Sequence, residues 1–157
     1  MKKNTLVANT VVWAILLAGC AAFQVWYRTG DVTSTYYAVQ GSQLLQVMLV
    51  TSGPILLFSI GALLGILFVW FKKICLGRGV RMTFRVIAAA FLACLALVLV
   101  PMLFGATLTV PVVIVVYLAM AAPAVIVILG FLYALGLAGV DTTKKGPFAK
   151  YLPDDDQ

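Results

Sequence analysis

The apolar and polar residues of this chain are segregated into long blocks, and four of the apolar blocks are long enough to cross a bilayer. A crossing needs about 20 residues, because roughly 30 Å of hydrocarbon is spanned at 1.5 Å per residue. Backbone polar groups in hydrocarbon must be hydrogen-bonded internally, so each block is expected to be helical. The predicted spans are residues 6–27, 44–71, 86–105 and 108–139.

Short polar connections join these blocks and set their directions. The connection GATLT between the third and fourth blocks is tight, so we expect those two spans to form an antiparallel hairpin. The sequence therefore predicts an all-α integral membrane protein, an antiparallel bundle of four transmembrane helices in one domain over residues 1–140. Residues 141–157 form a polar tail with too few apolar residues to fold alone.

Basic residues mark one side of the predicted domain. Of the 11 Lys and Arg residues, only Arg28 falls on the opposite side, and such an excess is typical of cytoplasmic loops. We therefore expect both termini in the cytoplasm of a bacterial inner membrane, and the clustering at span ends argues against nucleic acid as a partner. Anionic phospholipid at the cytoplasmic face is the expected partner of the central basic loop. Its headgroup-binding residues would be Lys72, Lys73, Arg78, Arg81 and Arg85.

The composition indicates that lipid solvates much of the chain. It also lacks residues that many catalytic sites require. The 157-residue chain is 64% hydrophobic and 10% charged, which is more apolar surface than a soluble domain of this size buries. It has no histidine, and its acids are confined to Asp31, Asp141 and three residues at the C-terminus. A His-ligated zinc, a bis-His haem and a Ser-His-Asp triad all lack their residues, so no cofactor or metal is expected.

Residues 17–20, LAGC, resemble a bacterial lipobox, the motif before which a lipoprotein signal is cleaved and lipidated on Cys20. Lys2 and Lys3 before an apolar stretch also fit such a signal. Against this, the apolar run continues past the cysteine to Tyr27 and has the length of a full span rather than of a signal core. We favour a retained first helix; the alternative is a three-span membrane lipoprotein.

The stretch TSGP, residues 51–54, is the candidate polar site at membrane depth. Proline removes a backbone donor, so carbonyls of the preceding turn and nearby hydroxyls could bind a cation or a polar solute, as in transporters with broken helices. The plainer interpretation is that the prolines only kink long spans, which membrane helices tolerate. The candidate kink site comprises Thr51, Ser52, Gly53, Pro54, Pro101 and Pro123.

Small residues recur at about every fourth position on each predicted span. Such faces let helix backbones approach closely, which promotes association inside lipid. They are expected to pack the four spans together, or alternatively one face docks a helix of another subunit. The residues concerned are Ala14, Ala18, Ala22, Gly61, Gly65, Ala89, Ala93, Gly130 and Ala134.

Three classes of function were weighed against this inventory. Missing catalytic groups and short connections favour a non-catalytic accessory or scaffolding subunit, bound to other membrane subunits or self-associated. A small oligomeric channel or transporter, with the kinked second span lining its path, is the alternative. An enzyme is not expected, because Ser52, Ser59 and Cys94 have no visible base to activate them.

Overall fold

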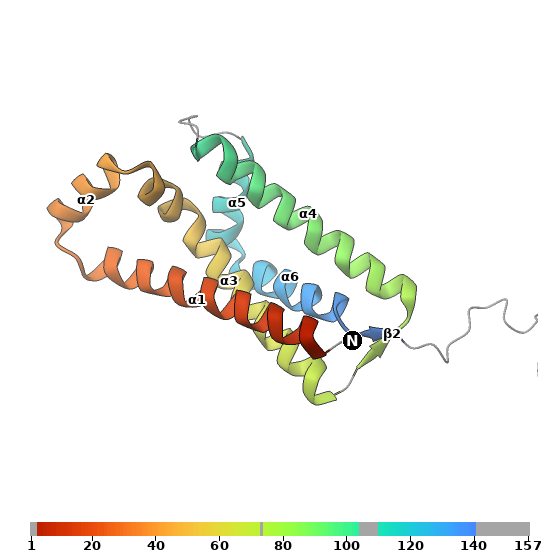
Figure 1. The fold of residues 1–157 in the computed structure, drawn as a ribbon. Helices are drawn as coiled ribbons and strands as arrows, with labels where there is room; N and C mark the ends of the chain where they lie inside the picture. Colours follow the sequence, from red (N-terminus) through yellow and green to blue (C-terminus); the bar gives the residue numbers. More distant parts are fainter. Residues whose placement is uncertain (1–2, 73, 104–109, 141–157) are drawn as a thin grey trace, which may run out of the picture.

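Helices make up almost all of the described chain (Figure 1). The computed structural model describes residues 3–72, 74–103 and 110–140. The exception is a pair of parallel strands, each two residues long. The elements in chain order are α1 (Lys3–Thr29), α2 (Val32–Gly41), α3 (Gln43–Lys72), β1 (Cys75–Leu76), α4 (Arg78–Leu103), α5 (Val110–Ala121), α6 (Pro123–Gly136) and β2 (Gly139–Val140).

Three of these helices are long and apolar enough to cross a membrane, as the sequence predicts. They cover Thr5–Thr29 in α1, Gln43–Lys72 in α3 and Arg78–Leu97 in α4. At 25, 30 and 20 residues, each reaches the length that a bilayer requires. The prediction of an all-helical membrane protein is therefore confirmed at this level.

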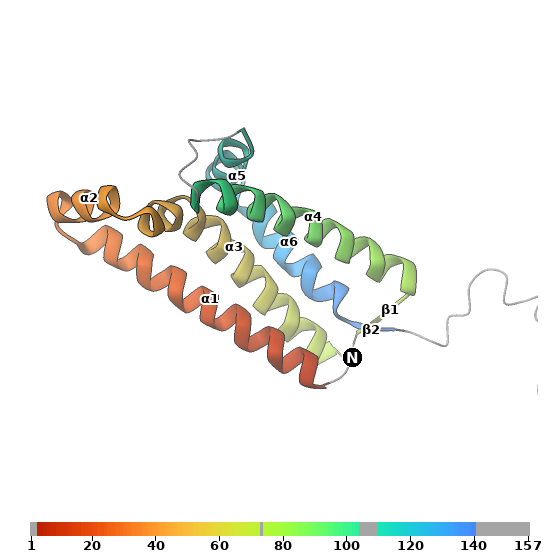
Figure 2. The ribbon, with the colours of Figure 1, turned by 45° about the horizontal axis from the view of Figure 1, so that its top comes forward.

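The predicted fourth span, residues 108–139, differs from a single helix. α5 ends at Ala121 and α6 begins at Pro123, and Ala122 between them adopts φ −141° and ψ 61°. Proline disfavours a helical conformation in the residue before it and cannot donate to the preceding turn, which explains the break. The two helices do not run in line (Figure 2). At 12 and 14 residues they are about 18 and 21 Å long, so neither alone crosses the hydrocarbon.

The helices pack in the order α1, α3, α6, α4, with α3 and α6 at the centre (Figures 1 and 2). The start of α1, the end of α3, the start of α4 and the end of α6 lie together at one end, which we call the basic end. The opposite end carries α2 and is called the α2 end. Arg28 lies there, at the end of α1.

The centre of the bundle is an aromatic cluster contributed by four helices. Phe58 of α3 lies 5.0 Å from Trp13 of α1 and 5.3 Å from Phe91 of α4, measured between ring centroids. Tyr133 of α6 meets the edge of Trp13 at 5.4 Å, and its hydroxyl donates to the side-chain oxygen of Asn9. Offset and edge-on pairs of this kind stabilise a core beyond the area they bury.

Glycines allow the closest contact in the molecule, between α3 and α6. A Cβ built on Gly61 would overlap the Val127 carbonyl, and one on Gly130 would overlap the Phe58 carbonyl. On Gly65 it would lie 2.6 Å from the Ala134 Cβ. Side chains at these positions would separate the helices, so the backbones meet directly, as in membrane helix pairs with small residues four apart.

Candidate functional site

The TSGP stretch lies within α3, which stays helical through Pro54. Thr51, Ser52 and Pro54 are buried, and the Thr51 hydroxyl donates to the Val47 carbonyl at 2.8 Å. Pro54 has no N–H to pair with the carbonyl of Val50, four residues before it. The site is thus a continuous helix with one weakened turn, not a broken helix of the kind that the sequence suggested.

A polar pair across two helices lies at this turn. The Gln24 amide of α1 donates through Nε2 to Ser52 Oγ of α3 at 2.7 Å, and Ser52 is fully buried. Sequence analysis singled out Ser52 but missed Gln24. The sequence feature that could have indicated Gln24 is an amide side chain inside an apolar span. It stands four residues before Arg28 and hence on the same helix face.

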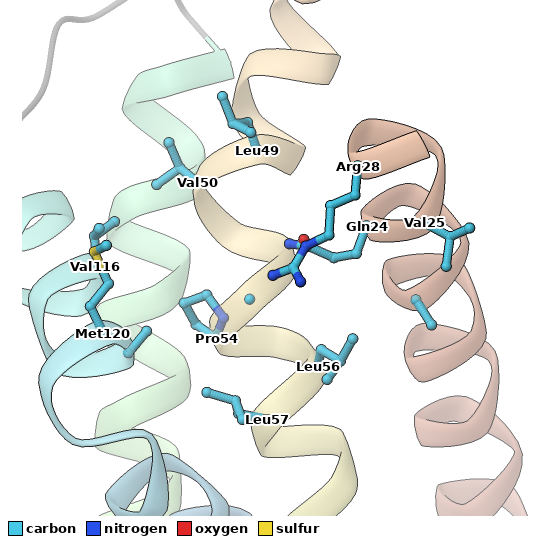
Figure 3. Close-up of a pocket in the computed structure, with 13 residues that line it drawn as sticks. Gln24, Val25, Arg28, Leu49, Val50, Pro54, Leu56, Leu57, Val116 and Met120 are labelled. Atoms are coloured by element: carbon cyan, nitrogen blue, oxygen red, sulfur yellow. The ribbon is translucent and has the colours of Figure 1, made fainter. Parts of the chain in front are cut away.

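A cavity of about 680 Å³ lies beside this pair, between α1, α3 and α5 (Figure 3). Its walls are mostly aliphatic, and its polar side chains are Gln24 and Arg28. The lining residues are Ala21, Gln24, Val25, Arg28, Leu49, Val50, Gly53, Pro54, Leu56, Leu57, Val116, Ala119 and Met120.

Arg28 points from the end of α1 into this cavity. In Figure 3 its side chain runs toward α3, and both Arg28 and Gln24 line the cavity. Helical side chains tilt toward the N-terminus of their helix, which for α1 is the basic end, so the charge is directed inward. Asp31 is the only acid in the described segments, and its carboxylate caps α2 by accepting from the Ser34 N–H at 3.0 Å. Within those segments no ion pair neutralises Arg28.

A second cavity of about 390 Å³ lies under α2 and adjoins the first. Arg28 and Leu49 line both. The second cavity is also lined mainly by apolar groups, to which Thr35, Tyr36 and Gln40 add hydroxyl and amide groups, and Thr35 is buried. Arg28 thus stands between this cavity at the α2 end and the aliphatic cavity deeper in the bundle.

Of the other predicted kink residues, Pro123 does not join this site. It is exposed at the start of α6 and does not line the cavity. Pro101 falls within α4, and its side chain lies outside the described residues. The structure therefore places Thr51, Ser52, Gly53 and Pro54 near Gln24 and away from Pro123.

The small-residue positions fall into two groups. Gly61, Gly65, Gly130 and Ala134 are buried where α3 meets α6. By contrast, the alanines that the sequence indicates on α1 and α4 are exposed, and other residues of these two helices are buried. The exposed alanines are Ala14, Ala18 and Ala22 of α1 and Ala89 and Ala93 of α4.

Two of the predicted headgroup-binding residues contact protein instead. Arg85 Nε donates to the Gly136 carbonyl at 2.8 Å, and Arg81 donates to the Ala138 carbonyl at 3.3 Å. A cation at a helix C-terminus is favourable because the last carbonyls carry partial negative charge. Lys72 and Arg78 are exposed, and Lys73 lies outside the described residues.

Comparisons with protein-family models, with curated protein sequences and with solved structures find no match. Across residues 3–72, 74–103 and 110–140, no group of three His, Cys, Asp or Glu side chains is placed to hold a metal ion.

Proposed function

We propose that the protein is a non-catalytic accessory or scaffolding subunit of a larger membrane protein complex. The observation that carries the proposal is the exposed small-residue face of α1, formed by Ala14, Ala18 and Ala22. A face of this kind suits close contact with another helix, whereas the glycine faces of α3 and α6 are already used inside the molecule.

The position of this face on α1 supports a partner outside the chain. α1 buries Trp13, Cys20 and Phe23. At 3.6 residues per turn, Ala18 lies about half a turn around the helix from Cys20, so the alanines lie on the side away from that buried face. α4 repeats the arrangement, because Ala89 and Ala93 are exposed while Phe91 between them is buried.

The distribution of charge supports an orientation for this subunit. Lys72, Arg78, Arg81 and Arg85 lie at the basic end, and Arg28 lies at the other. By the positive-inside rule the basic end faces the cytoplasm, which puts both termini there in a bacterial inner membrane.

Substitutions on the α1 face test the accessory role. Ala18→Leu should reduce co-purification of partner subunits from native membranes roughly tenfold, the equivalent of about 1.4 kcal/mol of lost helix packing. Ala8→Leu is the matched control, because Ala8 is also exposed on α1 but lies about 15 Å along the helix from Ala18. Quantitative mass spectrometry of gently extracted complexes gives the readout, and circular dichroism checks folding. Full retention of partners by Ala18→Leu would contradict the proposal for this face.

A small oligomeric channel or transporter is the second candidate, favoured by the cavity beside the Gln24–Ser52 pair. The pair, together with the Val50 carbonyl, to which Pro54 cannot donate, offers polar groups at membrane depth. Purified protein in liposomes would then pass a solute, and Ser52→Ala would alter its selectivity. Folded, oligomeric protein that passes no ion or small solute would rule this candidate out.

A further inference from the structure

We propose that the two adjoining cavities bind one anionic phospholipid, with its headgroup phosphate on Arg28 and an acyl chain along the aliphatic cavity. In the proposed orientation this lipid comes from the outer leaflet. The inference concerns a ligand site and does not depend on the accessory role.

The charge of Arg28 is the first argument. Its side chain points into the cavity, which Gln24 also lines, and Asp31 is engaged in capping α2 (Figure 3). Arg28 is exposed in the last turn of α1, where a headgroup at the membrane surface can reach its guanidinium. Its planar set of donors matches a phosphate, with which it can form two parallel hydrogen bonds.

The lining of the adjoining cavities is the second argument, because it is mainly apolar and carries a few polar side chains on the α2 side of Arg28. On the α2 side of Arg28 lie Thr35, Tyr36 and Gln40, which can bind the polar part of a headgroup. On the other side the cavity is lined by Leu56, Leu57 and other aliphatic residues. Its volume of about 680 Å³ falls within the roughly 300–1,000 Å³ of typical ligand sites.

The aliphatic walls favour a lipid over a small soluble anion. Inorganic phosphate would gain the contact with Arg28 but would leave the deeper cavity unfilled. In a bilayer an acyl chain is already present at this depth, so it can fill the aliphatic cavity without leaving hydrocarbon surroundings.

Retention of lipid through purification tests the proposal. The protein is exchanged into detergent with phosphatidylglycerol or with phosphatidylethanolamine of the same acyl chains, and native mass spectrometry counts the bound lipids. One phosphatidylglycerol per chain should be retained, at least about tenfold more than phosphatidylethanolamine. Arg28→Gln should abolish this preference, whereas Arg28→Lys should restore part of it because it keeps the charge.

A cavity-filling variant tests the acyl chain separately. A Cβ on Gly53 would meet no atom within 4 Å, so Gly53→Phe can place its ring in the cavity without displacing backbone. It should lower retention of phosphatidylglycerol about tenfold. Gly19→Phe is the matched control, because Gly19 is also in open space but does not line the cavity.

Three retention results would overturn the proposal, and one competition result would do so as well. They are equal retention of the two lipids by the wild-type chain, unchanged retention in Arg28→Gln, and unchanged retention in folded Gly53→Phe. Glycerol phosphate, which has the anion but no acyl chain, should not compete for the site. If it displaces the lipid completely, the cavity binds a soluble anion instead.

Discussion

At the scale of single residues, two glycines of α3 differ in the room that a side chain would have at each position. Gly61 lies against the α6 backbone, where a Cβ would overlap the Val127 carbonyl. Gly53 faces the cavity, and a Cβ there would meet nothing. Sequence analysis grouped Gly53 with the kink and Gly61 with packing, but it had no means of telling which neighbour each one faces.

These two positions should respond differently to alanine. Gly61→Ala should lower the free energy of unfolding by about 1–3 kcal/mol, because overlap with a backbone carbonyl must be relieved by separating the helices. Gly53→Ala should raise it by about 0.5–1 kcal/mol, since alanine is the better helix former. Unfolding in detergent, followed by circular dichroism, gives both values. A Gly61→Ala protein as stable as the wild type would show that the contact is looser than described.

The Gln24–Ser52 hydrogen bond should appear as a coupling between two substitutions. Gln24→Leu and Ser52→Ala, made singly and together, should give a coupling of about 0.6–1.7 kcal/mol, the range found for hydrogen bonds between membrane helices. Ser59→Ala is the control partner, because Ser59 is equally buried but donates within its own helix to the Ile55 carbonyl at 2.7 Å. A coupling of Gln24 with Ser59 as large as that with Ser52 would argue against a direct bond.

At the scale of elements, the sequence predicts long helices well and their interruptions poorly. α1, α3 and α4 follow from runs of apolar residues that lipid forces into helix. Pro54 and Pro123 look alike in sequence, yet α3 continues through the first and the last apolar run breaks before the second. Proline weakens a helix in both places, and contacts from neighbouring helices, which sequence does not display, determine whether the turn holds.

The start of α4 also depends on contacts with another helix that the sequence does not display. Residues 78–85 carry three arginines and a glycine and were expected to be part of a basic loop, yet they are helical. Arg81 and Arg85 contribute by reaching carbonyls at the end of α6, a contact across more than 50 residues of chain. No local pattern in the sequence predicts that contact.

Removing this contact should loosen the end of α6. Arg85→Ala leaves the Gly136 carbonyl without its donor, and the cost should be about 1 kcal/mol, as for hydrogen bonds to a partly exposed charged group. Hydrogen–deuterium exchange should quicken in peptides covering residues 133–138. Arg78→Ala, at an exposed site on the same helix, should leave those peptides unchanged. Equal exchange in the two variants would contradict the capping role.

At the scale of the whole molecule, the first helix is integral to the core. Trp13 packs on Phe58 and Tyr133, and Asn9 accepts a hydrogen bond from Tyr133. Cleavage before Cys20 would remove both residues and nearly two thirds of α1. These contacts support a retained first helix over a lipoprotein signal.

The intact mass of the protein from native membranes tests this interpretation. We expect a mass near 16.8 kDa, because the core depends on residues before Cys20. A lighter chain with lipid on Cys20 would establish the three-span lipoprotein. Trp13→Ala should meanwhile destabilise the full chain by about 3–5 kcal/mol, as expected for loss of a buried tryptophan.

The close contact between α3 and α6 also has a consequence for the order of events during synthesis. Gly65 and Gly130, on the two sides of this contact, are about 65 residues apart, which at roughly 5–20 residues per second separates their synthesis by about 3–13 seconds. During that interval α3 is in the membrane with its glycine face uncovered. Until α6 is made, another helix can meet that face, and a chain stalled before Pro123 would leave it uncovered.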